Sequence, residues 1–216
     1  QDYPFRTIGL LHTISPDGEE STCSGTLIAP RYVLTASHCL YDETKGQHVN
    51  TVDFYPGYND GYAPYGRVEA DSWIVTSGYV NAPCQGYCWQ RVQNDIAVIK
   101  LAQNAGDQLG WMGFGSTQNV RPFIGNIVGY PMDKPNFTMW RTSCDVDTNV
   151  GRPNTFEQRC DTAPGSSGAS IYDFDRARSD RIVYGVSVAE TDDANFGVRL
   201  APYHYCWVVN QIGKRC

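Results

Sequence analysis

Residues 23–39 read CSGTLIAPRYVLTASHC and decide the fold more than any other part of the chain. Two apolar and β-branched runs, residues 26–28 and 32–35, predict two short strands joined by a turn that contains proline. His38 follows the second run directly, and cysteines stand at both ends of the segment. A disulfide between them would close about 15 residues, contribute roughly 3 kcal/mol, and fix the loop that carries the imidazole.

The rest of the chain continues this β pattern. Short apolar runs alternate with Gly, Pro, Asn and Asp clusters, and residues 96–101 and 182–188 are the clearest further strands. Apolar residues keep helical spacing only from residue 203 to 212, with Lys214 and Arg215 just beyond. We therefore predict an all-β fold that closes with a C-terminal helix near 203–212.

Size and charge limit the classes of partner. At 216 residues and 41% hydrophobic, the chain can bury a sizeable core, either as one large domain or as two small, packed ones. The formal charge of −6 argues against nucleic acid or an anionic membrane as a partner. No stretch approaches the roughly 20 apolar residues of a membrane span. Gln1 in place of Met leads us to expect a processed mature form.

The eight cysteines predict disulfides, and hence secretion into an oxidising compartment. Cys84 and Cys88 form a close pair without the second pair or the histidines of a zinc site, so we interpret them as a small loop staple. No metal site is expected. The triplet Asn136-Phe137-Thr138 fits a glycosylation acceptor, which is informative only in a eukaryotic source.

Two further motifs carry chemistry. Asp95 directly precedes the apolar run 96–101, where an acid could also simply end a turn. Residues 161–170, DTAPGSSGAS, place a serine pair between two glycines, which alone could be an ordinary flexible turn. Structural roles are expected for the other histidines, which are His12, His48 and His204.

Taken together, these motifs resemble those of the chymotrypsin-like serine proteases. The order His, Asp, Ser separates this class from subtilisins and α/β-hydrolases. A hydrolase elbow would also need glycine where Ala169 stands. The resemblance implies His38 as general base, Asp95 as the acid that orients it, and Ser167, not Ser166, as nucleophile. It further implies an oxyanion hole formed by the N–H groups of Gly165 and Ser167.

The resemblance also implies the architecture: two packed antiparallel six-stranded β-barrels. We expect residues 1–105 to form the barrel with His38 and Asp95, and residues 106–216 the barrel with Ser167, joined at the polar stretch 103–108. Within the class, the chain is most similar to bacterial glutamyl endopeptidases, on segments that include Cys23 to Pro30, Tyr55-Pro56-Gly57, Ser77-Gly78-Tyr79 and Gly129-Tyr130-Pro131.

Two features depart from trypsin and from acid-cleaving relatives. Ser166 is uncharged, so the buried ion pair that activates trypsin cannot form. The pocket strand, residues 185–190, lacks the histidine that acid-cleaving members use. The expected pocket residues are Asp161, Thr162, Ser187 and Glu190. Asp161 and Glu190, with no cation beside them, would attract a basic side chain, so we expect a preference for Lys or Arg before the cleaved bond. A preference for Glu or Asp is the alternative.

The remaining cysteines are expected to pair by proximity of their segments, Cys144 with Cys160 and Cys206 with Cys216, although four cysteines allow three connectivities. The predicted function is hydrolysis of protein or peptide substrates through an acyl-enzyme, by a monomer without metal or organic cofactor. The alternative is a catalytically silent homologue that acts as a secreted binding module, which the 14 tyrosines could serve as contact residues.

Overall fold

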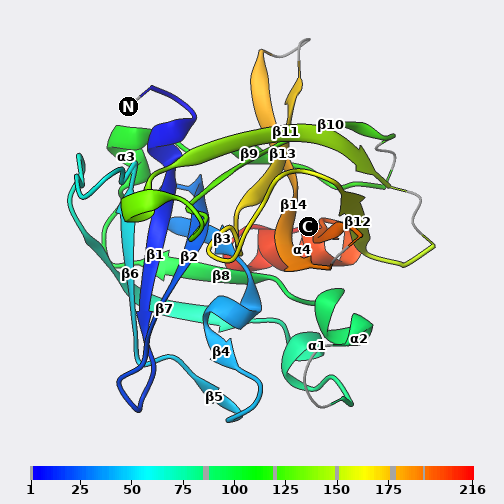
Figure 1. Cartoon of the computed structure of the whole chain (residues 1–216), viewed down its shortest axis with the longest axis horizontal. Helices are drawn as coiled ribbons and strands as arrows, with labels where there is room; N and C mark the ends of the chain where they lie inside the picture. Colours follow the sequence, from blue (N-terminus) through cyan, green and yellow to red (C-terminus); the bar gives the residue numbers. More distant parts are fainter. Residues whose placement is uncertain (1, 85–87, 119–120, 149–150, 176–178, 192) are drawn as a thin grey trace.

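The computed structural model consists mainly of β-strands, with one longer helix at the C-terminal end (Figure 1). It describes residues 2–84, 88–118, 121–148, 151–175, 179–191 and 193–216. Within these residues, no helix is both long and apolar enough to cross a membrane.

The first half of the chain closes into an antiparallel barrel in the order β1-β2-β3-β8-β7-β6. Its strands are β1 (Ile8–Ile14), β2 (Glu20–Ala29), β3 (Tyr32–Thr35), β6 (Thr51–Pro56), β7 (Val68–Val75) and β8 (Ala97–Leu101). Alternate residues of β6 face the interior, as a half-buried strand requires. Around the barrel lie η1 (Phe5–Thr7), η2 (Ser37–Cys39), β4 (Tyr41–Asp42), β5 (Gln47–His48), α1 (Ser77–Val80) and α2 (Trp89–Val92).

The second half forms another six-stranded ring, β13-β10-β11-β12-β15-β14, which the pairing of β13 with β14 closes. Its strands are β10 (Phe123–Gly129), β11 (Trp140–Asp147), β12 (Thr155–Gln158), β13 (Ser170–Asp175), β14 (Asp180–Glu190) and β15 (Asn195–Arg199). The short β9 (Gly113–Phe114) joins β14 in parallel. The predicted pair of antiparallel six-stranded barrels is therefore confirmed.

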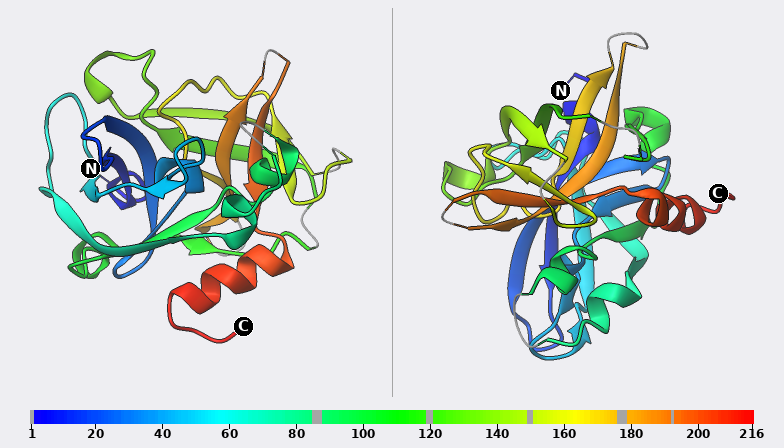
Figure 2. Two further views of the ribbon diagram at one scale, coloured as in Figure 1. Left: turned by 90° about the horizontal axis from the view of Figure 1, so that it is seen from below. Right: turned by 90° about the vertical axis from the view of Figure 1, so that its right-hand side faces the viewer.

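Residues 102–112, which include α3 (Gly106–Leu109), connect the last strand of the first barrel to β9. The predicted boundary between residues 105 and 106 falls in this connection and stays a prediction. The expected C-terminal helix is α4 (Pro202–Gln211), which lies at one edge of the molecule (Figure 2). It buries His204, Val208 and Val209.

Four disulfides staple this fold, with the pairs expected from the sequence: Cys23–Cys39, Cys84–Cys88, Cys144–Cys160 and Cys206–Cys216. The first joins β2 to η2, and the third joins β11 to the segment that precedes the Gly/Ser-rich loop. Asn136 belongs to η3 (Pro135–Phe137), but its side chain lies outside the described part of the structure.

Candidate active site

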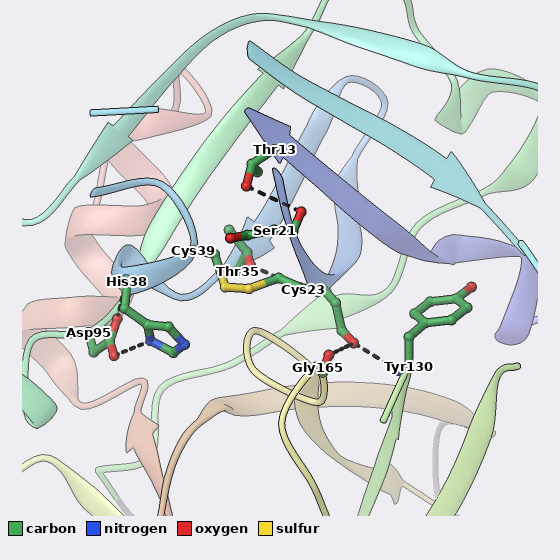
Figure 3. The surroundings of a disulfide bond; sticks show 10 residues. Thr13, Ser21, Cys23, Thr35, His38, Cys39, Asp95, Tyr130 and Gly165 are labelled. Carbon is green, nitrogen blue, oxygen red and sulfur yellow. Dashed lines mark hydrogen bonds and ion pairs between the residues drawn. A yellow bond between two sulfur atoms is a disulfide. The ribbon is translucent and has the colours of Figure 1, made fainter. Parts of the chain in front are cut away.

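The antiparallel pairing of β3 with β8 brings the predicted base and acid together. Thr35 at the end of β3 lies opposite Ala97 at the start of β8, so the residues just beyond these ends become neighbours. Asp95 accepts a 2.9 Å hydrogen bond from the backbone N–H of His38 through Oδ1, and its Oδ2 lies 2.6 Å from His38 Nδ1 (Figure 3). The carboxylate thus fixes both the loop and the ring.

The electrostatic environment suits a general base. Asp95 is 5% exposed, whereas the His38 side chain remains 28% exposed toward solvent. Burial by itself lowers the pKa of His38, but the charge of Asp95, the hydrogen bond to it, and the charge of Glu43 outweigh this effect and raise the pKa above its usual value. The imidazolium that forms during proton transfer is therefore stabilised.

Ser167 lies between β12 and β13, in a loop whose peptide groups are each oriented by a partner. The carbonyl of Pro164 accepts from Met132 N at 2.7 Å, and the carbonyl of Ser166 accepts from Ala169 N at 2.9 Å. Because N–H and C=O point in opposite directions across a trans peptide, the N–H groups of Gly165 and Ser167 turn away from these partners. Among the described residues, neither N–H has an acceptor.

Two glycines allow the loop to take this shape. Gly165 has φ +92° and Gly168 has φ +83°, in the left-handed region that only glycine enters freely. A Cβ on Gly165 would collide with the carbonyl oxygen of Tyr130, and one on Gly168 would collide with Ser24 O and Thr35 Oγ1. The loop is therefore packed against β2, the end of β3 and the residue that follows β10.

One open cavity of about 1050 Å³ brings His38, Asp95, Gly165 and Ser167 together. Its other walls are partly aromatic and partly acidic, and they include Tyr55, Tyr58, Met132, Phe137, Glu19, Glu20, Asp42 and Glu43. A cavity of this size can hold several residues of an extended peptide beside the imidazole.

The predicted pocket residues are distributed differently. Asp161 and Thr162 line a second cavity of about 220 Å³, together with Ser166. Lys134 and Arg141 line the same small cavity, so Asp161 has cations near it that the pocket strand alone did not indicate. The sequence could not place these two residues beside Asp161, because they lie 27 and 20 positions before it in the chain. The pocket residues themselves stay a prediction.

The other two pocket candidates lie on β14. Ser187 is 3% exposed, and its backbone pairs with the loop, donating to Ala169 O at 2.8 Å and accepting from Gly168 N at 2.9 Å. Glu190 is exposed at the end of the strand, opposite Asn195. Asn195 in turn donates to Thr162 Oγ1 at 2.8 Å, a contact that the sequence analysis missed.

In the described part of the chain, Cys23, His38 and Cys39 form the one group of side chains close enough together to hold a metal ion. The two sulfur atoms are joined in a disulfide, so they are not thiolate ligands.

A buried carboxylate on the imidazole, a serine in the same cavity, and two unoccupied N–H groups between two six-stranded barrels define the chymotrypsin-like class. The sequence profile of the trypsin-like peptidase domain matches residues 23–178, and the chain belongs to this family.

Individual proteases are also similar to the chain in sequence. The chain is 29% identical over 178 residues to the glutamyl endopeptidase of Bacillus licheniformis, covering 82% of this chain and 52% of that protein. It is 26% identical over 246 residues to human serine protease 23, covering 96% of this chain and 58% of that protein. The chain thus spans little more than half the length of these relatives.

Among solved structures, a Glu endopeptidase in complex with MPD superposes with a TM-score of 0.81 at 27% identity, covering 97% of this chain and 91% of that chain. The protease Anisep from Arthrobacter nicotinovorans, with a TM-score of 0.75 at 22% identity and coverage of 93% and 92%, shares the fold.

Proposed function

We propose that the protein is a serine endopeptidase that hydrolyses peptide bonds through an acyl-enzyme. The observation that carries the proposal is the 2.6 Å contact between His38 Nδ1 and Asp95, in the cavity that also contains Ser167. With Nδ1 bonded to the carboxylate, the other ring nitrogen is free to take the proton from the Ser167 hydroxyl.

The reaction then follows from the loop geometry. Ser167 Oγ attacks the substrate carbonyl, and His38 first accepts the serine proton and then delivers it to the leaving amine. The oxygen of the tetrahedral intermediate is bound by the N–H groups of Gly165 and Ser167, which have no acceptor among the described residues. A water molecule, activated by His38 in the same way, then attacks the acyl-enzyme, which releases the acid product and restores the Ser167 hydroxyl.

The test is covalent labelling by an active-site serine reagent, with turnover of a peptide ester measured in parallel. We expect the protein to be labelled, and Ser167→Ala to lose labelling and about 10³- to 10⁶-fold of kcat. Ser166→Ala is the matched control, since it removes the neighbouring hydroxyl, and it keeps most of the turnover. An unlabelled wild-type protein would instead support the silent homologue with a binding role.

For the residue before the cleaved bond, the better supported preference is Glu or Asp. Lys134 and Arg141 line the cavity of Asp161. Lys134 is paired with Asp133, another acid of this cavity, at 2.6 Å, but the two cations still weaken the attraction of the cavity for a basic side chain. Since Thr162 Oγ1 already accepts from Asn195, its own hydrogen remains free to be donated to a carboxylate. The similarity in sequence to a glutamyl endopeptidase and in structure to a Glu endopeptidase supports the same preference.

The preference for Lys or Arg is retained as the second candidate, because exposed Glu190 at the end of β14 can still attract a cation. A peptide library that varies only the residue before the cleaved bond separates the two. Cleavage after Glu and Asp supports the first preference, whereas cleavage after Lys and Arg overturns it.

We further propose that the protein acts outside the cell, as a monomer, on protein or peptide substrates. Its four disulfides are typical of an oxidising compartment. Light scattering on the purified protein measures the oligomeric state directly, and a dimer mass would contradict the proposal.

A further inference from the structure

A buried hydroxyl of the first barrel contacts the loop that carries the nucleophile of the second. Ser24, on β2, is 0% exposed. Its Oγ donates to the carbonyl of Gly165 at 2.8 Å and accepts from the backbone N–H of Tyr130 at 3.0 Å; Figure 3 shows these two partners side by side.

The backbone of Ser24 is engaged as well. Its N–H donates to the carbonyl of Ser167 at 2.8 Å, and its carbonyl accepts from Thr35 Oγ1 at 2.9 Å. The residue therefore holds two of the loop's carbonyl groups at once, those of Gly165 and Ser167. A hydroxyl that both donates and accepts can adopt few orientations, so the contact is directional.

The carbonyls of Gly165 and Ser167, which Ser24 restrains, belong to the peptide groups next to those whose N–H groups would bind the oxyanion. Fixing the carbonyl of Gly165 sets the plane of the peptide that follows it, and Ser166 N completes that plane by donating to Ala163 O at 2.9 Å. Gly165 itself has no side chain to limit its rotation. Without the Ser24 hydroxyl, the N–H of Gly165 is held only through the contact of Pro164 with Met132.

No charged pair performs this task. Among the ion pairs of the described residues, none includes a member of the loop 161–168. The hydroxyl of Ser166, at the position where trypsin has its activating acid, accepts a long 3.5 Å hydrogen bond from Ala163 N, and it has no other hydrogen-bond partner among the described residues. The loop is therefore held by neutral hydrogen bonds, and the two from Ser24 come from the other barrel.

We propose that Ser24 is a positioning residue, whose hydroxyl holds the loop 163–168 in the conformation that presents the N–H groups of Gly165 and Ser167 to the oxyanion. The inference rests on the proposed peptidase function. Ser24 touches neither substrate nor reacting atoms, so its removal acts on transition-state stabilisation and leaves substrate binding in the main cavity intact.

The first experiment compares Ser24→Ala with the wild-type protein, using a peptide ester and a peptide aldehyde that forms a tetrahedral adduct. We expect kcat to fall by roughly 10- to 100-fold, less than the loss on deleting an oxyanion donor itself, while KM stays within about threefold. The affinity for the aldehyde should fall by the same factor as kcat. A loss of packing alone would not make these two quantities fall together.

Thr26→Val is the matched control. Thr26 lies on the same strand, is also 0% exposed, and its hydroxyl has no hydrogen-bond partner among the described residues. We expect its kcat and aldehyde affinity to stay within about twofold of wild type, because valine has the same shape without the hydroxyl. An equal loss in Thr26→Val and Ser24→Ala would overturn the proposal.

A second pair covers the case in which Ser24→Ala fails to fold. Threonine and valine have nearly the same shape at position 24, but only threonine keeps the hydroxyl, because valine has a methyl group in its place. If both variants fold, Ser24→Thr and Ser24→Val must therefore differ in kcat and in aldehyde affinity. Equal values in this pair would overturn the proposal. The Ser167→Ala variant separates failure of the Ser24 role from failure of the peptidase function. If the Ser24 variants keep wild-type kcat while Ser167→Ala is inactive, only the role of Ser24 is rejected. If the wild-type protein is not labelled by the serine reagent, the peptidase function is rejected as well.

Discussion

At the residue scale, the site depends on polar groups that are buried and paired. Tyr79 is 2% exposed, and its hydroxyl donates to Glu43 Oε2 at 3.0 Å, which holds a second carboxylate at the edge of the cavity that contains His38. Glu43 thus contributes to the raised pKa of His38 without contacting the ring as Asp95 does. The imidazole has one carboxylate that orients it and another that only adds charge.

This arrangement predicts a shift in the pH–rate profile. Glu43→Gln removes a negative charge and should lower the pKa of His38, so the acid limb of kcat/KM moves to lower pH while the plateau is retained. Asp95→Asn should instead cost about 10⁴-fold in kcat. Glu20→Gln, another acid of the same cavity, is the control and should leave the acid limb in place.

Residues adjacent in sequence were the easiest to predict. His38 and the Cys23–Cys39 disulfide were expected from one continuous segment. Ser167 was expected only once its Gly/Ser segment was considered together with the His38 and Asp95 motifs. Ser24 lies in the same segment as His38, but a serine in a strand gives no signal, because its partners Gly165 and Tyr130 are more than 100 positions away. Contacts of that kind depend on how the two barrels pack.

At the element scale, the loop around Ser167 is held on its other side by a disulfide. Cys144 on β11 is bonded to Cys160, which is 4% exposed and immediately precedes the loop. The carbonyl of Cys160 also accepts from Asn195 Nδ2 at 2.9 Å. The Cys206–Cys216 disulfide instead ties α4 to the last residue of the chain.

The two disulfides should therefore differ in their effect on activity. Removing either pair by double Cys→Ala substitution should lower the free energy of unfolding by about 3 kcal/mol, since the bridged cysteines are 16 and 10 positions apart. Only loss of Cys144–Cys160 should lower kcat at a temperature where both variants are folded. Urea titration and ester turnover measure the two effects, and equal turnover in both variants would contradict the prediction.

The predicted elements were correct where the sequence pattern was long enough. The run 32–35 coincides with β3, and the helix expected over 203–212 is α4 (Pro202–Gln211). The helices α1 and α2 were not predicted, because four residues are too few to show a helical period. The strands β4, β5 and β9 were not predicted either, because two residues are too few to show the alternation of a strand.

At the scale of the whole molecule, one buried titratable group makes the stability of the protein sensitive to acid. His204, on α4, is 0% exposed. Burial lowers the pKa of His204 to about 4, although a backbone contact at Arg199 acts in the opposite direction. The neutral form is favoured in the folded protein, so the unfolded state binds more protons below pH 6.5.

The stability that His204 contributes should be complete above pH 6.5 and be lost as the pH falls toward 4, by about 3 kcal/mol in total. His204→Gln should remove this part of the pH dependence, whereas His48→Gln, at an exposed histidine, should not. Urea unfolding at pH 7.5 and pH 4.5 measures it, in a Ser167→Ala background that prevents autolysis. An unchanged pH dependence in His204→Gln would refute the assignment.

The neighbouring positions of Cys23 and Ser24 on β2 have a consequence for a population of these molecules. Cys23 anchors the segment with His38, and Ser24 holds the loop with Ser167, so one strand keeps both halves of the machinery in place. If the proposed role of Ser24 holds, a molecule whose two barrels separate loses the contacts of Ser24 with Gly165 and Ser167, and we expect it to lose catalytic activity at that step. Under the proposed peptidase function, partly opened molecules in a concentrated solution would then be substrates of intact molecules but would not cleave them.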